Sequence, residues 1–475
     1  MRINIYSIIY IRTKQEKIIF IIIILLIIQS IIKRKESLKK ENLELNNNYI
    51  KIKNDLNFPS NDKLNKKIRI GIYTTGLSGG GLQRSTSLMV KYFYQIKLFE
   101  IILFTVNKHE ENEYTIPKNI KRIIIQHYNL DTLIKEAGKR MIDILIYQFP
   151  VYEQIERLNK LRNIKVIFYL HQSFLYWIYY NYFLFINLYK TYQALKYVIS
   201  LIPFENDFLF KKWGISSILM DNFISYEYNS IIQSDLSSKI ILMLGRASDK
   251  LKRFDLGIKS MKYIIQEIPD CELKIISDLL DIDHLQNLKV KLNLEKYINF
   301  IGFTSTPEIY FKNSSLHLFP SISESFGMVL CETKIYGIPN ILIGLDYIKM
   351  AKGGTIILYD DSPESISRES INILKNINYR KKLGKEARKS MKQFKNELLL
   401  KRWVKLILSI FKGDEYYKNF KNQDRNIPEN KSLNIIKNQI KLLKMRNKNF
   451  ENITINKLVN FTFLENIISL NLTNN

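Results

Sequence analysis

Cysteine and histidine are both scarce in this sequence, and their scarcity limits the kinds of site that the chain can build. The 475 residues include two cysteines, Cys271 and Cys331, and five histidines. Two cysteines are too few for a disulfide framework and lack the paired spacing of a zinc site. The few histidines form no cluster typical of a metal centre. The sequence therefore predicts no metal ion held by cysteine or histidine.

Acidic residues are few relative to basic ones. The chain has 45 Asp and Glu against 72 Lys and Arg, which gives a formal net charge of +27. Such an excess favours an anionic partner, either a phosphate group, an acidic lipid headgroup or a nucleic acid. The chain is also rich in Ile, Lys and Asn, a bias that an AT-rich genome imposes on any protein. Charge alone therefore does not choose among these partners.

One apolar run near the amino terminus is a candidate membrane anchor. It extends from Ile18 to Ile32, with three basic residues shortly before it and three directly after it. A spanning helix needs about 20 apolar residues, so the run is short unless flanking lysines reach the interface. Its length also fits a signal-peptide core, but no small-residue cleavage site follows. We expect an uncleaved signal anchor over residues 1–35, rather than a cleaved signal or a buried helix. The dense basic residues after the run favour a cytosolic catalytic region, with a lumenal one as the alternative.

Short apolar runs alternate with amphipathic stretches from residue 68 onward, which predicts parallel sheets covered by helices on both faces. A polar stretch at 222–238 separates two series of such runs. The chain is long enough for two cores. We therefore predict an α/β fold with two Rossmann-like domains at residues 68–230 and 231–411, a tether at 36–67 before them and a Lys- and Asn-rich tail at 412–475. The predicted strands are Ile68 to Tyr73, Ile101 to Thr105, Ile142 to Tyr147, Lys165 to Leu170, Lys239 to Leu244, Leu273 to Ile276, Ile298 to Ile301, Leu316 to Phe319 and Asn340 to Ile343.

Two glutamates, Glu324 and Glu332, follow the predicted strand Leu316 to Phe319 at a spacing of eight residues. Gly327 permits a tight turn before an apolar helix, so Glu324 is expected in a loop and Glu332 inside the helix. Both carboxylates then border a helix amino terminus, whose free N–H groups suit a phosphate. An acid beside a phosphate is costly unless it accepts hydrogen bonds. Sugar or ribose hydroxyls are its expected partners.

Basic residues and glycines follow other predicted strands. Gly245 and Arg246 follow the strand that ends at Leu244, and Lys252 comes six residues after that Arg. Two cations at a strand-to-helix junction can hold a diphosphate. The glycine loop after Tyr73 allows the backbone to approach a ligand closely, but it has neither the Walker Lys-Ser/Thr pair nor a G-x-G-x-x-G fingerprint. ATPase and dehydrogenase functions are therefore not supported.

In combination these motifs resemble the signature of retaining glycosyltransferases of the GT-B fold, the large group 1 family, also called glycosyltransferase family 4. The resemblance covers roughly Ile68 to Phe411 and is strongest from Lys239 to Pro339. It implies two facing Rossmann-like domains, the first for the acceptor and the second for the nucleotide sugar. The residues that carry it are Pro320 and Ser321 before the glutamate pair, Gly337 and Pro339 after it, Gly245, Arg246 and Lys252, and Gly80, Gly81 and Arg84 in the first loop.

The resemblance also implies a role for each matching residue. Glu332 would bind the ribose of the donor, and His171, which directly follows the predicted strand Lys165 to Leu170, would position the donor sugar. The expected catalytic residues are His171, Arg246, Lys252 and Glu324. The expected donor-binding residues are Gly80, Gly81, Arg246, Lys252, Phe326, Gly327, Met328 and Glu332.

Three details depart from the family pattern or remain open. Arg253 stands where the family often has a glycine, and Ser277, Asp278 and Leu279 replace a glycine-rich turn. The triplet Asp281-Ile282-Asp283 matches the metal-binding D-x-D of another glycosyltransferase fold, but such triplets are common by chance, and no metal requirement is expected. The aromatic segment Phe174 to Tyr192 predicts a buried helix or, alternatively, a surface that docks on a bilayer.

The implied function is transfer of a hexosyl group from a nucleotide sugar to a hydroxyl of a glycan or lipid-linked acceptor, with retained anomeric configuration. We expect no nucleic-acid partner and no cofactor beyond the donor. One alternative is a non-catalytic, membrane-associated protein that binds anionic lipid or nucleic acid through its charge. A lesser alternative is a nucleotide-sugar epimerase with the same two-domain fold.

Overall fold

The computed structural model describes residues 66–110, 113–148, 152–173, 176, 191–225, 228, 231–304, 306–414, 417–418, 435, 438–439 and 441–442. The expected anchor at Ile18 to Ile32, nearly all of the expected tether, most of the aromatic segment and most of the tail lie outside the described residues. Within the residues described, no helix has both the length and the apolar character needed to cross a bilayer.

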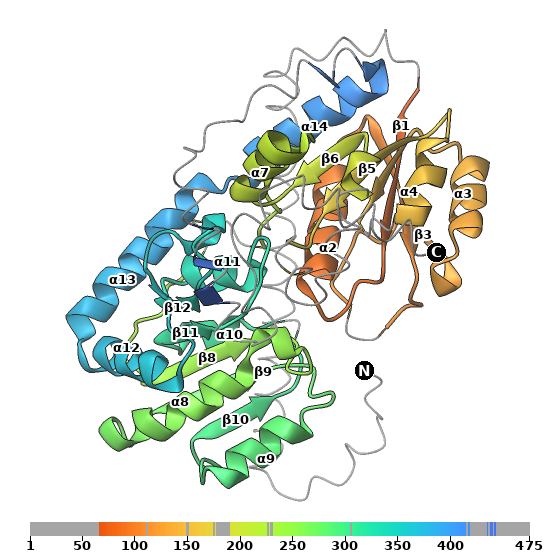
Figure 1. The fold of residues 1–475 in the computed structure, drawn as a ribbon. Helices are drawn as coiled ribbons and strands as arrows, with labels where there is room; N and C mark the ends of the chain where they lie inside the picture. The colour runs from red at the N-terminus through yellow and green to blue at the C-terminus, as the bar shows by residue number, and fades with distance from the viewer. Residues whose placement is uncertain are drawn as a thin grey trace, which may run out of the picture. The chain divides into compact units, whose positions relative to one another are not determined.

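The first sheet is built from parallel strands in the order β3-β2-β1-β4-β5-β6-β7. Figure 1 shows these strands from red to yellow-green, with β1 inside the sheet rather than at its edge. The chain winds from β1 outward to β3 and then from β4 outward to β7, so the winding reverses between β1 and β4. The elements of this part are β1 (Ile68–Thr74), α2 (Gly81–Tyr94), β2 (Phe99–Thr105), β3 (Lys121–Ile124), η3 (Gln126–Tyr128), α3 (Leu130–Lys139), β4 (Ile144–Tyr147), α4 (Tyr152–Asn159), β5 (Lys165–Leu170), β6 (Tyr197–Ser200), α7 (Pro203–Trp213) and β7 (Ile218–Leu219).

The second sheet is also parallel throughout, in the order β10-β9-β8-β11-β12-β13. Here the winding reverses between β8 and β11. The elements of this part are β8 (Ile240–Leu244), η4 (Lys250–Lys252), α8 (Phe254–Glu267), β9 (Glu272–Ile276), α9 (Asp283–Lys291), β10 (Ile298–Ile301), α10 (Glu308–Lys312), β11 (Leu316–Phe319), α11 (Met328–Ile335), β12 (Asn340–Ile343), η5 (Lys349–Ala351), β13 (Thr355–Leu358), α12 (Pro363–Lys375), α13 (Ile377–Ser390), η6 (Met391–Gln393) and α14 (Asn396–Lys412).

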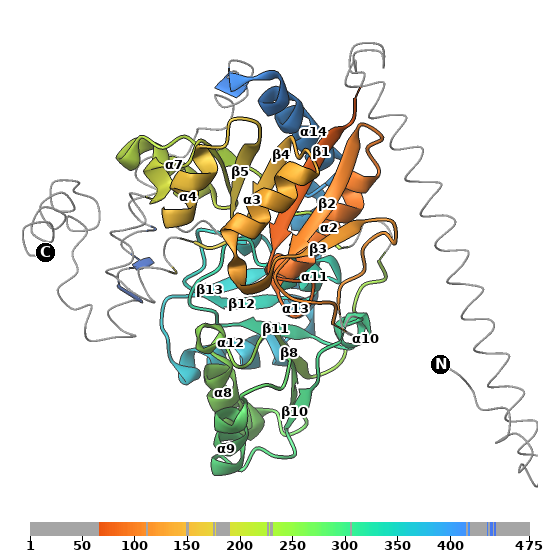
Figure 2. The ribbon, with the colours of Figure 1, turned by 90° about the vertical axis from the view of Figure 1, so that its right-hand side faces the viewer.

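Apolar side chains on both faces explain why the inner strands read as continuous hydrophobic runs. In β8, Ile241 and Met243 share a core with helix residues such as Ile258, because every second residue of a strand points to the same face. On this side of the sheet, α8 contacts both α9 and α12 (Figure 2). The intervening Leu242 is also fully buried, so the opposite face is covered too. The predicted α/β fold with two parallel sheets is confirmed.

Helix α14 follows the second sheet in the chain, but it packs on elements of the first. The Trp403 ring lies 5.5 Å from Phe93 of α2 and 5.4 Å from Tyr169 of β5, measured between ring centroids. At the start of the helix, the Asn396 side chain accepts a hydrogen bond from the Ile224 N–H and donates one to the Ile224 carbonyl. The sequence pattern alone had grouped this helix (blue in Figure 1) with residues 231–411.

Candidate functional site

A cavity of about 440 Å³ lies at the carboxyl ends of strands from both sheets. On the first-sheet side, Thr75, Gln148 and His171 line it directly after β1, β4 and β5. On the second-sheet side, the loops after β8 and β11 contribute Arg246 and Ser323. Of these strands, β1 and β4 flank the point where the first sheet reverses its winding, and β8 and β11 flank that point in the second sheet. Open α/β sheets bind ligands at such points. The volume suits a ligand of drug-like size, about 300 to 1,000 Å³.

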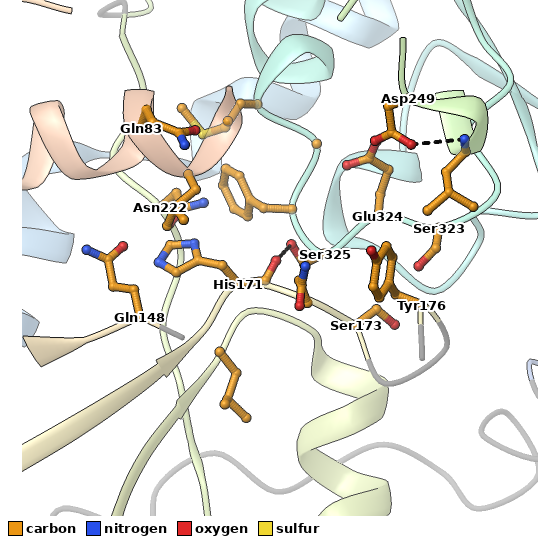
Figure 3. Close-up of a pocket in the computed structure, with 18 of the residues that line it drawn as sticks. Gln83, Gln148, His171, Ser173, Tyr176, Asn222, Asp249, Ser323, Glu324 and Ser325 are labelled. Carbon is orange, nitrogen blue, oxygen red and sulfur yellow. Dashed lines mark hydrogen bonds between the residues drawn. The ribbon is translucent and has the colours of Figure 1, made fainter. Parts of the chain in front are cut away.

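The cavity brings together most of the residues that the sequence predicted. Figure 3 shows Glu324 and His171 among the side chains around it. Gly80 and Glu332 are not among the lining residues: Gly80 directly precedes α2, and Glu332 lies inside α11. The predicted residues that line the cavity are Gly81, His171, Arg246, Lys252, Glu324, Phe326, Gly327 and Met328.

Two helix amino termini meet at this cavity. A Cβ atom on Gly81, the first residue of α2, would lie 3.6 Å from the Cγ atom of Met328, the first residue of α11. Each helix is preceded by a glycine, Gly80 or Gly327, so no side chain caps either terminus. Gly327 has a φ of 79°, a left-handed conformation that favours glycine. The first-turn N–H groups can therefore donate hydrogen bonds to an anionic ligand such as a phosphate.

Two cations and two acids line the second-sheet side. Lys252 Nζ lies 2.5 Å from Glu324 Oε1, and Arg246 lies 4.0 Å from Asp249. The Arg246 side chain is 54% exposed, so its guanidinium is accessible to a ligand. Asp249 also accepts a hydrogen bond from the Leu251 N–H and thereby caps η4. Because the four charges cancel, a diphosphate would have to compete with the two carboxylates for the two cations.

Asp249 was missed by the sequence analysis, although the signal was present. It lies between the two predicted cations in the stretch that follows β8, as an acid in an otherwise basic loop.

His171 is a neutral side chain at the end of β5. Burial lowers the pKa of its imidazole to about 3, so the ring carries no proton charge near neutral pH. The ring packs against Tyr169, with centroids 4.1 Å apart, and its Nε2 has no hydrogen-bond partner among the described residues. The His171 carbonyl accepts a hydrogen bond of 2.6 Å from Ser325 Oγ in the loop after β11 (Figure 3). Such an imidazole can orient a ligand by hydrogen bonding but not by charge.

Glu332 is held by residues from the first-sheet part of the chain. Its carboxylate forms an ion pair with Arg84 of α2 and accepts a hydrogen bond of 3.1 Å from Ser225 Oγ. Arg84 also donates to Ser225 Oγ at 2.9 Å and lies over the Tyr114 ring. Burial raises the pKa of the Glu332 carboxyl above its usual value, and the Arg84 guanidinium opposes that rise. The expected contact between Glu332 and ribose stays a prediction.

Two buried amides complete the first-sheet side. Gln148, which directly follows β4, is 3% exposed, and its Oε1 lies 3.1 Å from Thr86 Oγ1. Among the described residues, its Nε2 has no hydrogen-bond partner. Asn222 is also buried, and its Oδ1 accepts hydrogen bonds from Ser85 and Tyr169. The sequence analysis missed Gln148, although a polar residue at the end of a buried strand is a usable signal.

The D-x-D triplet lies away from the cavity. Asp281 and Asp283 are both exposed, Asp283 opens α9, and neither residue lines the cavity. In the part of the chain that the structure describes, no group of three or more His, Cys, Asp or Glu side chains is placed to hold a metal ion.

Comparison with known proteins agrees with this geometry. The family model described as "Glycosyl transferases group 1" matches residues 227–390. An uncharacterized glycosyltransferase of Haemophilus influenzae is 32% identical over 104 residues, which cover 22% of this chain and 29% of that protein. The N-acetyl-alpha-D-glucosaminyl L-malate synthase of Bacillus anthracis is 24% identical over 184 residues, covering 38% of this chain and 48% of the relative. This chain thus spans less than half the length of either curated relative.

A solved structure extends the likeness to both sheets. Anabaena HepE, in complex with UDP and glucose, superposes with a TM-score of 0.57 at 11% identity, covering 72% of this chain and 99% of HepE. At such an identity the likeness shows a shared fold alone. Residues 227–390 therefore match the group 1 glycosyltransferase family, within a fold that HepE shares.

Proposed function

We propose that this protein transfers a sugar from a nucleotide-sugar donor to an acceptor hydroxyl. The observation that carries the proposal is the cavity itself. It joins two uncapped helix amino termini with Arg246 and Lys252, partly within the segment that matches the group 1 family model. Bound UDP and glucose in the similar HepE fold support a donor of this class.

The diphosphate of the donor is assigned to the second-sheet side. Arg246 and Lys252 provide positive charge there, and the first-turn N–H groups of α11 provide hydrogen-bond donors. Each charge-assisted hydrogen bond contributes about 1.5 to 3 kcal/mol. On this proposal the two cations neutralise the leaving diphosphate without a metal ion. Glu332 would contact the ribose only if the ribose hydroxyls share the Glu332 carboxylate with Arg84 or displace Arg84 from it.

The transferred sugar is assigned to the space between His171 and Glu324, which line the same cavity (Figure 3). The neutral imidazole orients the sugar, and the Glu324 carboxylate accepts hydrogen bonds from its hydroxyls. By the family resemblance, a hexose is transferred with retention, and the leaving phosphate helps to deprotonate the acceptor. The protein then acts through positioning and charge stabilisation.

Membrane attachment rests on the sequence alone. The apolar run from Ile18 to Ile32 supports a single amino-terminal anchor, with basic residues that favour a cytosolic catalytic region. This position suits a glycan or lipid-linked acceptor.

Thermal unfolding of the full-length protein in detergent, with and without UDP-, GDP- and ADP-sugars, tests the proposal. A ligand that binds only the native state stabilises it by about 2.7 kcal/mol at a hundred times its Kd. We expect one nucleotide family to raise the unfolding midpoint.

The non-catalytic alternative predicts a different result. No nucleotide sugar would then shift the midpoint, whereas anionic vesicles or nucleic acid would bind with an affinity that falls steeply as salt increases. That outcome would contradict the proposed enzyme and support the non-catalytic binding protein.

A further inference from the structure

Charge is distributed unequally between the two sides of the cavity. The charged residues that line it are Arg246, Asp249, Lys252 and Glu324, and all four lie in the second-sheet part of the chain. His171 faces them as a neutral imidazole. The first-sheet side offers amides and hydroxyls, from Thr75, Gln83, Gln148, Gln172, Ser173 and Asn222.

The basic residue in the first turn of α2 does not add a charge to the first-sheet lining. Arg84, in the first turn of α2, is paired with Glu332 and does not line the cavity. The first-sheet residues that line the cavity are therefore uncharged, and a charged group bonded to them is an acid, Glu205 of α7, which accepts a hydrogen bond from Ser173.

The buried amides on this side are held in place by the protein. Asn222 accepts hydrogen bonds from Ser85 at 2.7 Å and from Tyr169 at 2.6 Å. Gln148 is fixed through Thr86, which leaves one end of its amide without a partner among the described residues. The amide can be turned over, but one polar atom then still lacks a partner. A buried polar group without a partner is unfavourable, so a ligand is expected to complete the hydrogen bonding of Gln148.

We propose, on the basis of the function proposed above, that the first-sheet side binds an uncharged, hydroxyl-bearing acceptor, a glycoside, with Gln148 as a hydrogen-bonding partner. Amides and hydroxyls both donate and accept hydrogen bonds, as the hydroxyls of a sugar do. An anionic acceptor would lose its hydration close to the donor diphosphate and the Glu205 carboxylate, with no cation among the described first-sheet residues that line the cavity to compensate. Charge complementarity therefore selects a neutral acceptor.

Matched acceptors test the proposal in the full-length protein. The neutral set is the methyl glycosides of glucose, galactose, mannose and N-acetylglucosamine, and the anionic set is the 6-phosphates of the same sugars together with L-malate. With the donor that stabilises the protein, nucleotide release above hydrolysis is measured. We expect at least one neutral glycoside to be used at least about tenfold faster than its phosphorylated counterpart. Preference for an anion, or no transfer to any neutral glycoside while the donor binds, would overturn the proposal. Failure of the proposed function looks different, because no nucleotide sugar would then shift the unfolding midpoint.

Variants of Gln148 test the assigned contact. Gln148→Leu is expected to raise the acceptor KM about tenfold or more, to leave the donor-induced midpoint shift unchanged, and to be partly rescued by Gln148→Asn. Gln393→Leu makes the same change on exposed η6, away from the cavity, and should have no effect. If Gln148→Leu does not fold, Thr75→Val removes a lining hydroxyl on the same side at nearly constant volume. An unchanged acceptor KM in whichever of these two variants folds contradicts the assignment.

Discussion

Replacing Lys252 with alanine is expected to slow sugar transfer by about a hundredfold to a thousandfold, the usual cost of losing one preorganised charged or hydrogen-bonding group that stabilises a transition state. Lys252 lines the cavity and carries one of the two cations assigned to the leaving diphosphate. Its side chain is 24% exposed, and its pair with Glu324 lies at the cavity surface. Because Glu324, 14% exposed, then loses its cation, the thermal unfolding midpoint of the variant is measured beside its rate, which separates lost catalysis from lost stability. Nucleotide release in the presence of acceptor measures the effect.

Lys250 provides the matched control for this prediction. It belongs to the same short helix η4, is exposed, and does not line the cavity. Lys250→Ala removes the same charge from the same loop and should keep nearly the full rate. Equal rates for the wild type and Lys252→Ala would show that Lys252 does not stabilise the departing diphosphate.

Replacing Glu332 with alanine is expected to lower the free energy of unfolding by about 3 to 5 kcal/mol, because it leaves a buried cation without its partner. The side chains of Glu332 and Arg84 are only 6% and 14% exposed, and the pair joins α11 to α2. The same variant should lose the stabilisation by nucleotide sugar, since the amino termini of these two helices border the cavity. Urea unfolding with and without donor measures both effects.

A double-variant cycle separates the pair from its surroundings. Combining Glu332→Ala with Arg84→Met should cost less than the sum of the two single changes, because no unpaired charge then remains. Glu386→Ala, on the exposed surface of α13, controls for the loss of an acid as such. If the Glu332→Ala variant is as stable as the wild type and is still stabilised by the donor, then Glu332 has neither the structural role nor the ligand-binding role.

The sequence predicted the inner strands well because parallel strands buried on both faces are short continuous apolar runs. Strands β5, β10, β11 and β12 have the predicted bounds. One inner strand, the four-residue β6, was also missed, although it is fully buried. The other missed strands carried weaker signals. β3 begins with Lys121 and Arg122 at the edge of its sheet, β7 has two residues, and β13 is only partly buried at an edge. Edge strands can be short or polar, so apolar periodicity does not reveal them.

The site was predictable where it depends on local motifs. Gly327, Glu324 and Lys252 lie at strand ends and helix starts, and those positions follow from the pattern of apolar runs. The pairing of Arg84 with Glu332 was not predictable, because it joins positions 248 residues apart and leaves no local signal. The orientation of Gln148 likewise depends on Thr86 of a different element.

The most direct test of the account is the structure of the reaction product, determined by nuclear magnetic resonance after incubation with the stabilising donor and a neutral glycoside. We predict equal amounts of nucleoside diphosphate and a new glycoside, whose anomeric configuration is the same as that of the donor. An epimerised nucleotide sugar without a new glycosidic bond would show an epimerase instead. Recovery of the donor unchanged after incubation with every acceptor would contradict the proposed transfer.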